Sequence, residues 1–265
     1  MHRLLLLLSL LVLVSSKVYA EPVRNLYNAE VTVTGTEEPE RTRGFRMGLT
    51  DVVVKLTGDV RLADSDKLAP LLEKPHPLVE HFEYEDRMKS IPVHDEQGTR
   101  ERPHFLRMRF NAAELNKALA QLGLTKWADD RPVVAVWLGV KTAVKSFVIR
   151  ASGGEDYGQR IVITEASQRR GVPIVLPGAQ TGNEAVTFAD VSADKFEKIK
   201  AASKGADAWL SGELSITESG YWDITWRLRW KDQQRVWTKQ GVSFDVAIKD
   251  GLQTAAFVLS GNMPM

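Results

Sequence analysis

Histidines and carboxylates gather in one stretch of this 265-residue chain, and together these residue types could bind a divalent transition metal. The residues are His76, Glu80, His81, Glu83, His94, Asp95, Glu101 and His104. None of the histidines follows the His-Glu-x-x-His spacing that places two imidazoles on one helix face. The stretch is also broken by Pro75, Pro77, Pro92 and Pro103. We therefore expect solvated loop histidines, with no metal and no cofactor.

A Ser-x-x-Lys pattern at residues 192–195 could supply a serine nucleophile beside a lysine, as in penicillin-interacting enzymes. The companion Ser-Asp-Asn and Lys-Thr-Gly motifs of those enzymes do not occur in the sequence. A serine at the start of a helix caps it by accepting a hydrogen bond from an N–H group that has no other partner. We expect Ser192 to be such a cap, and we assign no catalytic residue.

Three arginines, Arg41, Arg43 and Arg46, fall at the beginning of a predicted helix. Positive charge there opposes the helix dipole, so helix stability does not explain it. The arginines are candidate contacts for an anionic partner such as a glycan chain or a lipid headgroup. The alternative is that they pair with Glu37, Glu38 and Glu40 or are simply solvated.

Aromatic side chains alternate with polar ones at residues 221–231, which predicts a strand with one buried face. Trp222, Trp226 and Trp230 lie on that face together with Ile224 and Leu228. Flat indole rings could stack on sugars, but the aliphatic residues in register with them favour a packed core.

The elements that position these residues follow from hydrophobic spacing in the first half of the chain. Residues 29–34 alternate as a strand, and residues 40–57 form one apolar helical stripe that ends at Gly58. Residues 59–103 are rich in proline and irregular, with a short strand at 79–84. We then expect a strand at 105–110. A helix from Asn111 to Gly123 follows it, with Glu114 completing a capping box.

The second half predicts a central strand at 132–140, a helix at 156–170, a buried run at 172–176 and a helix from Ser192 to about Gly205. Strands at 208–214, 221–231 and 242–248 follow, and a helix at 250–259 closes the chain. The fold class is α/β or α+β with mixed sheets, in the order β-α-β-α and then β-α-β-α-β-β-β-α. We expect an N-terminal region at 21–126 and a C-terminal domain at 127–265, packed separately or as one body.

The first twenty residues read as a secretory signal peptide. Residues 1–3 are a short basic start, residues 4–14 are apolar except for Ser9, and residues 18–20 end in a small residue suited to cleavage before Glu21. Eleven helical residues would span roughly half of a ~30 Å hydrocarbon core, which disfavours the alternative of an uncleaved anchor. No later stretch is apolar for the ~20 residues that a membrane span needs.

Charge and cysteine content exclude several kinds of partner and site. The chain has 35 Lys and Arg against 34 Asp and Glu, so its net charge of +1 gives no reason to expect a nucleic-acid partner. It has no cysteine, which excludes disulfides, thiolate metal sites and lipid attachment through cysteine.

The chain resembles an uncharacterised domain-of-unknown-function family of exported Gram-negative envelope proteins, over almost the whole predicted mature chain. The resemblance is carried by residues 26–35, Arg41, Arg43, residues 48–49 and 54–59, Trp127, residues 131–132, 136–138, 170–173 and 176–177, residues 206–208 and Gly212. That family has no assigned activity, so the resemblance implies a compartment and no reaction.

The second half also resembles, more weakly, the small α/β domain of several envelope assembly proteins. They are the N-terminal domain of the TolB type, the CsgG type of curli secretion and the outer-membrane activators of penicillin-binding proteins. The matching pattern is strand, helix, strand, helix, residues 205–214, two alternating strands and a final helix. The chain differs from the activators and the curli proteins in lacking a lipid-anchor cysteine.

These observations together predict a periplasmic protein that works by binding, as an accessory or assembly factor of the cell envelope and not as an enzyme. Its partner would be an envelope protein or an anionic envelope component. The alternative is a hydrolase of an envelope polymer or ester, with a site assembled from Asp, Glu and Ser far apart in the sequence.

The export prediction can be tested directly. We expect the protein to fractionate with the periplasm and its N-terminal sequence to begin at Glu21, directly after Ala20. N-terminal sequencing of the fractionated protein checks this, and an intact Met1 in the membrane pellet would contradict it.

Overall fold

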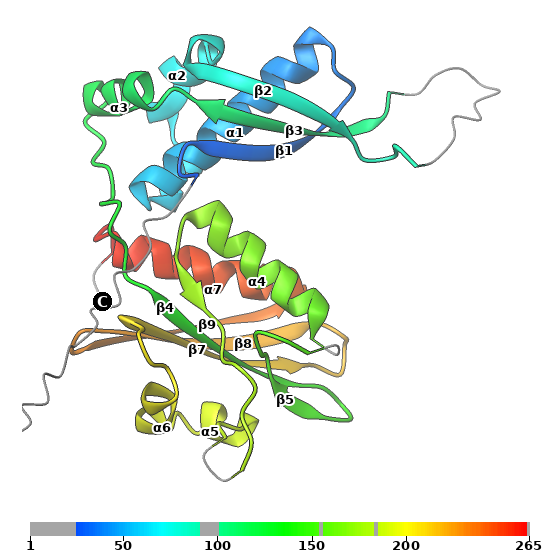
Figure 1. The fold of residues 1–265 in the computed structure, drawn as a ribbon, viewed down its shortest axis with the longest axis vertical. Coiled ribbons are helices and arrows are strands. Elements are labelled where there is room, and N and C mark those ends of the chain that lie inside the picture. Colours follow the sequence, from blue (N-terminus) through cyan, green and yellow to red (C-terminus); the bar gives the residue numbers. More distant parts are fainter. Residues whose placement is uncertain (1–24, 91–100, 154–155, 183–184, 264–265) are drawn as a thin grey trace, which may run out of the picture.

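The computed structural model describes residues 25–90, 101–153, 156–182 and 185–263. The predicted signal peptide, with Ala20 and Glu21 at its cleavage site, lies outside the described residues, as do His94 and Asp95. The chain builds two sheets with helices packed on them, the mixed α/β architecture that the sequence predicts (Figure 1). Within the described part of the chain, no helix is both long enough and apolar enough to cross a bilayer.

The N-terminal half is a three-stranded antiparallel sheet in the order β1-β3-β2. The strands are β1 (Asn28–Thr34), β2 (Val79–Asp86) and β3 (Pro103–Phe110). Along β1, Val31 and Val33 are buried while Glu30 and Thr32 are exposed. Because side chains of a strand alternate between the two faces, one face of this sheet meets the core and the other remains polar.

Helix α1 (Glu38–Thr57) covers the apolar face of this sheet (Figure 1). Its apolar stripe is buried as predicted, and Gly58 ends it with a left-handed backbone (φ 72°). Gly44 and Gly48 face the sheet, where an added Cβ would collide with the side chains of Leu106 and Met108. These two glycines therefore let the helix approach the strands closely.

Residues 59–103 are more regular than the sequence indicates. They contain the 3-10 turns η1 (Val60–Asp64), η2 (Asp66–Leu68) and η3 (His76–Leu78), the short helix α2 (Ala69–Glu73) and the whole of β2. Helix α3 (Ala112–Gln121) follows β3, with the Asn111 side chain accepting the N–H of Glu114 as expected of its cap.

The C-terminal half is a mixed sheet in the order β5-β4-β7-β8-β9, with β6 also pairing with β4. The strands are β4 (Val134–Lys141), β5 (Ser146–Val148), β6 (Ile174–Val175), β7 (Ala208–Ile216), β8 (Trp222–Trp230) and β9 (Gln233–Val242). Strand β4 is parallel to β6 and β7, and the other pairs are antiparallel. Strand β4 is buried along almost its whole length because helices cover both faces of the sheet there.

Helices α4 (Tyr157–Arg170) and α7 (Phe244–Leu259) pack on one face of this sheet, and α5 (Phe188–Ser192) and α6 (Phe196–Ala201) on the other (Figure 1). Two predictions fail here. The helix expected from Ser192 to Gly205 is two short helices, and Ser192 ends the first of them. Its side chain caps no helix, because its hydroxyl donates to Glu213 at 2.9 Å.

The strand expected at 242–248 is also wrong, since most of that segment is the beginning of α7. The apolar alternation that suggested a strand is broken by Ala247 and Ile248, which are both buried, whereas Val246 is 40% exposed. Neighbouring buried residues fit the helical period, on which positions 247, 248, 251, 252 and 255 share one face. The last strand is instead β9, a mostly polar edge strand.

The tryptophan face of β8 lies in the core, as predicted. Trp226 is 1% exposed, and its ring fits between Gly212 of β7 and Gly251 of α7, where any Cβ would collide with it. Its indole N–H donates to the carbonyl of Ala247 at 3.0 Å. Trp222 and Trp230 are partly buried against the same cluster.

The packing around Trp226 predicts a large effect of its removal. We expect Trp226→Ala to lower the free energy of unfolding by about 3–5 kcal/mol, because two glycines cannot fill the cavity that the ring would leave. Denaturant unfolding of both proteins measures the difference. An unchanged unfolding midpoint would show that the ring is not part of the core.

Candidate binding cleft

The two halves meet around Arg131, a residue that is 2% exposed. Its Nη2 donates to the carbonyl of Lys55 at the end of α1 (2.9 Å), and its Nη1 donates to the carbonyl of Gly171 after α4 (2.8 Å). The guanidinium also stacks on Trp127, at 4.1 Å from the ring centroid. Burial lowers the pKa of Arg131 to about 10, so the side chain keeps its charge near neutral pH.

Lys55 is a second cation at this junction, and it is also buried (8% exposed). Its Nζ donates to the carbonyl oxygen of Asn28 in β1 at 2.7 Å. Burial is the main reason that the pKa of Lys55 is lowered to about 8. The carboxylate of Asp51 opposes this shift, whereas the charges of Arg131 and Arg170 act in the same direction as burial.

The carboxylate that lies one helical turn before Lys55 is Asp51, and two arginines of α4 bind it. Arg169 forms a close ion pair with Asp51 (2.7 Å), and Arg170 lies 3.6 Å from it. Asp51 is therefore shared among several cations. The junction holds four cations, Lys55, Arg131, Arg169 and Arg170, beside this one carboxylate.

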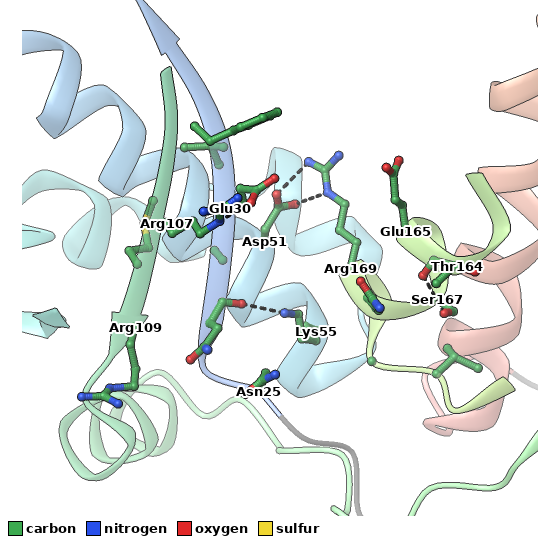
Figure 2. A pocket seen from close by; sticks show the side chains of 18 of the residues that line it. Asn25, Glu30, Asp51, Lys55, Arg107, Arg109, Thr164, Glu165, Ser167 and Arg169 are labelled. Atoms are coloured by element: carbon green, nitrogen blue, oxygen red, sulfur yellow. Dashed lines mark hydrogen bonds and ion pairs between the residues drawn. The ribbon is translucent and has the colours of Figure 1, made fainter. Parts of the chain in front are cut away.

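An open cleft of about 1350 Å³ lies between the polar face of the N-terminal sheet and helix α4 (Figure 2). One wall is formed by β1 and β3, the floor by Asp51 and Lys55 of α1, and the far wall by α4 and β6. The lining side chains with charge or imidazole are Glu30, Asp51, Lys55, His81, Glu83, Arg107, Arg109, Glu165 and Arg169. The cleft thus combines charged side chains with apolar ones, and both halves of the chain contribute to it.

The sheet wall of the cleft carries a cross-strand charge ladder. Arg107 of β3 pairs with Glu30 of β1 at 2.7 Å and with Glu85 of β2 at 2.5 Å, and Arg109 pairs with Glu80 at 3.0 Å. Glu30 and Arg109 are exposed, and they lie on the face of the sheet opposite the one that packs on α1. Charged residues on an uncovered sheet face keep it soluble and leave it open to a polar partner.

The serine hydroxyl of the far wall has its partner within its own helix. Ser167 donates to the carbonyl of Thr164 at 2.7 Å, one turn earlier in α4. His81, the imidazole of the lining, lies on β2, in the opposite half of the cleft. The described residues of the cleft therefore show no hydroxyl held by an imidazole, the pairing that activates a serine nucleophile.

The three arginines singled out in the sequence lie together at the beginning of α1, outside the cleft lining. Arg41 pairs with Glu38 and Arg43 with Glu40, while the Nε of Arg46 donates to the carbonyl of Leu72 at 2.9 Å. Ion pairing with the neighbouring glutamates, the alternative considered from the sequence, thus occurs for Arg41 and Arg43. As contacts for an anionic partner they stay the alternative docking surface predicted from the sequence, at the beginning of α1 and outside the cleft.

The described histidines are dispersed. His76 lies 3.0 Å from Glu38 and packs edge-on against Phe45, whereas the Nδ1 of His104 lies 2.8 Å from the carbonyl oxygen of Arg102. Among the residues that the structure describes, no group of three or more His, Asp and Glu is arranged to hold a metal ion.

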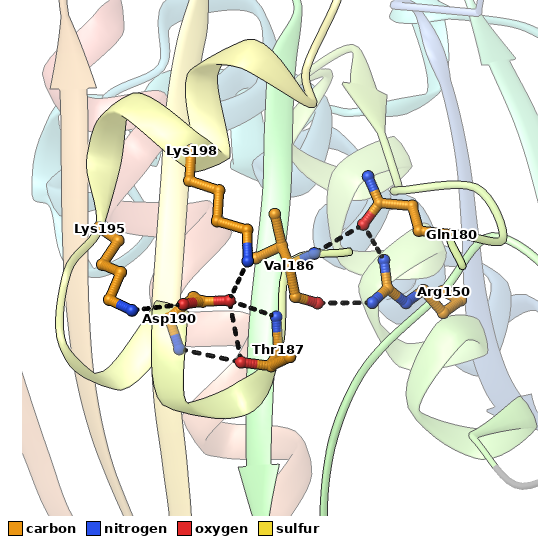
Figure 3. A network of polar contacts seen from close by, with 7 residues as sticks. All are labelled: Arg150, Gln180, Val186, Thr187, Asp190, Lys195 and Lys198. Atoms are coloured by element: carbon orange, nitrogen blue, oxygen red, sulfur yellow. Dashed lines mark hydrogen bonds and ion pairs between the residues drawn. The ribbon is translucent and has the colours of Figure 1, made fainter. Parts of the chain in front are cut away.

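The Ser-x-x-Lys segment belongs to a structural network on the other face of the C-terminal sheet (Figure 3). Lys195 and Lys198 both bind Asp190, at 2.9 and 2.7 Å, and their hydrogen bonds hold the pKa of that carboxyl well below its usual range. Asp190 also forms a capping box with Thr187. The lysine of the pattern is thus bound to a carboxylate and does not contact Ser192, which removes the arrangement that a serine nucleophile would need.

Sequence reasoning missed Lys55, Asp51 and Arg169 as site residues. Lys55 interrupts an apolar run in α1 between Val54 and Leu56, and a charge in a buried stripe is a usable signal. Arg169 gave no such signal, because its partner Asp51 is 118 residues away in the sequence.

The buried lysine predicts a pH dependence of stability. Because the pKa of Lys55 is 10.5 in the unfolded chain and about 8 in the folded one, the unfolded state binds more protons between these pH values. Stability should therefore rise as pH increases from 8 to 10.5, and below pH 8 the full cost of about 3 kcal/mol applies. Lys55→Met lacks the titrating group, so its stability should not show this dependence. The difference in unfolding free energy between the variant and the wild type should therefore be about 3 kcal/mol smaller at pH 10.5 than at pH 7.

Denaturant unfolding at several pH values measures this effect. Lys117→Met, at an exposed position of α3, is the matched control and should show no such change. An identical stability difference at pH 7 and pH 10.5 for Lys55→Met would contradict the prediction.

Comparison with known proteins gives a family match over part of the chain. A comparison with curated proteins finds no match. The family that does match covers β1 to α3 and ends before β4. A domain of unknown function, DUF8605, is found at residues 20–128.

Proposed function

We propose that this protein is a periplasmic accessory factor of the cell envelope that works by binding, and that its binding site is the cleft between the two sheets. The partner is an envelope protein or another envelope component that offers an anionic group to the cleft floor. The charge arrangement around Lys55 is the observation that carries this proposal.

Lys55 is a desolvated cation, and its Nζ donates to a neutral carbonyl oxygen, that of Asn28, at 2.7 Å. The adjacent carboxylate, Asp51, is already bound by Arg169 and approached by Arg170. Asp51 attracts Lys55, but burial outweighs this attraction, so the charged form of Lys55 is still disfavoured. A protein tends to keep such a buried charge where it serves a site. A carboxylate or phosphate entering the cleft would supply further negative charge.

Export is supported from two sides. The first twenty residues have the composition of a cleavable signal, and the matched domain begins at residue 20, one residue before the predicted mature N-terminus at Glu21. The C-terminal half contains strands β4 and β7 with intervening helices, followed by two antiparallel strands and a final helix. This order supports the proposed kinship of that half with the small α/β domain of the envelope assembly proteins.

Binding is favoured over hydrolysis by the chemistry of the two candidate sites. In the cleft, the Ser167 hydroxyl is bound to its own helix. On the opposite face, the hydroxyl of Ser192 donates to Glu213, and the nearby Lys195 is held by Asp190. Neither serine is hydrogen-bonded to a lysine or an imidazole among the described residues, the bases that activate a serine in the Ser-x-x-Lys and triad enzymes.

The test uses two sets of arginine substitutions in the mature chain. Arg109→Gln with Arg169→Gln removes two cleft cations whose side chains are exposed, so folding should be little affected. Arg41→Gln, Arg43→Gln and Arg46→Gln together are the matched control on the same half, outside the cleft. Both sets, and Ser192→Ala, are used to complement a deletion strain and to capture partners from cross-linked envelopes at low and high salt.

We expect the cleft pair to reduce both complementation and capture, most strongly at low salt, because electrostatic attraction is screened as salt rises. The arginine triple and Ser192→Ala should remain active. Loss of function only in the arginine triple would indicate that the partner docks at the beginning of α1 and not in the cleft. Loss of function only in Ser192→Ala, with the protein present at its normal level, would favour the hydrolase alternative over binding.

A further inference from the structure

Strand β1 presents a free edge to the cleft. It is paired with β3 on one side, and the hydrogen bonds Phe110 N–H to Tyr27 C=O and Gly35 N–H to Arg102 C=O flank this ladder. In an antiparallel pair the residues bonded to the partner alternate along the strand. Odd-numbered residues of β1 therefore bond to β3, and even-numbered residues direct their N–H and C=O groups away from it.

The two ends of this free edge are already occupied. The carbonyl of Asn28 accepts the Nζ of Lys55 at 2.7 Å, and the N–H of Thr34 donates to Glu40 at 3.2 Å. Glu30 and Thr32 lie between them, and their main-chain groups have no partner among the described residues. The middle of the edge thus offers two donors and two acceptors to the cleft, with the repeat of a β-ladder.

The opposite wall restricts what can reach this edge. Helix α4 and strand β6 face β1 across the cleft, and both contribute to its lining (Figure 1, Figure 2). A folded sheet, including that of a second copy of this chain, could not approach β1 without displacing α4. A single extended segment needs only about 4.8 Å beside the strand, and it can enter a cleft of about 1350 Å³ from its open side.

We propose that the occupant of the cleft is an extended peptide segment of a partner protein, which adds to β1 as a further strand and carries an acidic residue. This inference rests on the proposed function of the cleft and names its partner class. The main chain of the segment pairs with Glu30 and Thr32, and its carboxylate approaches Lys55 at the Asn28 end of the edge. Main-chain hydrogen bonds of this kind give affinity, and pockets beside the strand give specificity.

The charges of the cleft are consistent with such a segment. Arg107 is already paired with Glu30 and Glu85, so the sheet wall needs no further counter-ion. Lys55 shares the carboxylate of Asp51 with Arg169 and Arg170, and it lies where β1 begins. The acidic residue is therefore expected at the end of the segment that lies beside Asn28.

The main test removes one edge donor without touching the ladder to β3. Thr32→Pro deletes an outward N–H and places a ring in the path of an incoming strand, and proline is tolerated at edge positions of this kind. Thr238→Pro is the matched control. Thr238 is an exposed threonine at a free-edge position of β9, paired with Thr225 of β8 and outside the cleft.

The probe is a library of random twelve-residue peptides displayed on phage, selected on the mature wild-type chain, after which the strongest binder is synthesised. Titration calorimetry then gives its Kd for each variant. We expect Thr32→Pro to weaken binding at least about tenfold, from the lost hydrogen bond and the steric block, and Thr238→Pro to change it by less than about twofold. Equal affinity of the wild type and Thr32→Pro overturns the inference.

A second measurement keeps the test valid if Thr32→Pro does not fold. Peptides are N-methylated at every second residue, in two complementary sets, and bound to the wild type. A strand that adds to β1 turns only alternate N–H groups toward it, so one set should abolish binding and the other should preserve it. Equal effects of both sets overturn strand addition.

The acidic residue is tested by exchanging the acidic residue of the selected peptide for its amide. This exchange should weaken binding to the wild type but have little effect on Lys55→Met, because the pair would already be broken. Equal weakening in both proteins overturns the assigned position of the carboxylate. If peptide binding is insensitive to Thr32→Pro but is lost in the variant with Arg109→Gln and Arg169→Gln, the cleft function stands and strand addition fails. If envelope capture is unchanged in that cleft variant, the proposed function fails as well.

Discussion

The arrangement of the two halves depends on the hydrogen bonds of one buried guanidinium. Arg131 sits between the end of α1 and the end of α4 and donates to carbonyl groups of both. The last carbonyls of a helix have no partner within it and carry the negative end of its dipole. A planar cation with five donors can satisfy carbonyls from two helices at once, which a lysine could not do in the same geometry.

This junction determines where the cleft lies and which charges reach it. With the ends of α1 and α4 held together, the polar face of the N-terminal sheet and its free strand edge are brought opposite α4. The neighbouring main-chain bonds, Trp127 N–H to Leu56 C=O and Asn262 Nδ2 to Thr57 C=O, support the same contact. The cost of this arrangement is a concentration of positive charge around Asp51, and burial depresses the pKa of Lys55, Arg131 and Arg170 alike.

The two faces of the C-terminal sheet have different roles. One face packs Trp226 against α7, with glycines on both sides of the ring, and forms the largest described core cluster. On the other face, Asp190 holds two lysines and caps α5, while Arg150 joins Gln180 to Val186 (Figure 3). The second arrangement, together with the buried side chains of Val186, Val191 and Ile199, orders the segment that contains α5 and α6. The Ser-x-x-Lys pattern at residues 192–195 lies in this segment and serves packing, because its lysine is one of the two that bind Asp190.

Local patterns determined the fold class, the extent of α1 and the burial of the β8 tryptophans, because hydrophobic period and glycine positions act within one element. They failed at α7, where residues 242–248 fit both periods and the packing of Ala247 and Ile248 against β8 decided for a helix. They also failed at Ser192, whose hydroxyl binds a carboxylate 21 residues away. Only the presence of a charged residue at the candidate site could be predicted from the sequence, and its surroundings could not. Lys55 in an apolar stripe was visible in the sequence, but its desolvation, its distance from Asn28 and the ion pair of Asp51 with Arg169 exist only when the two halves are packed together.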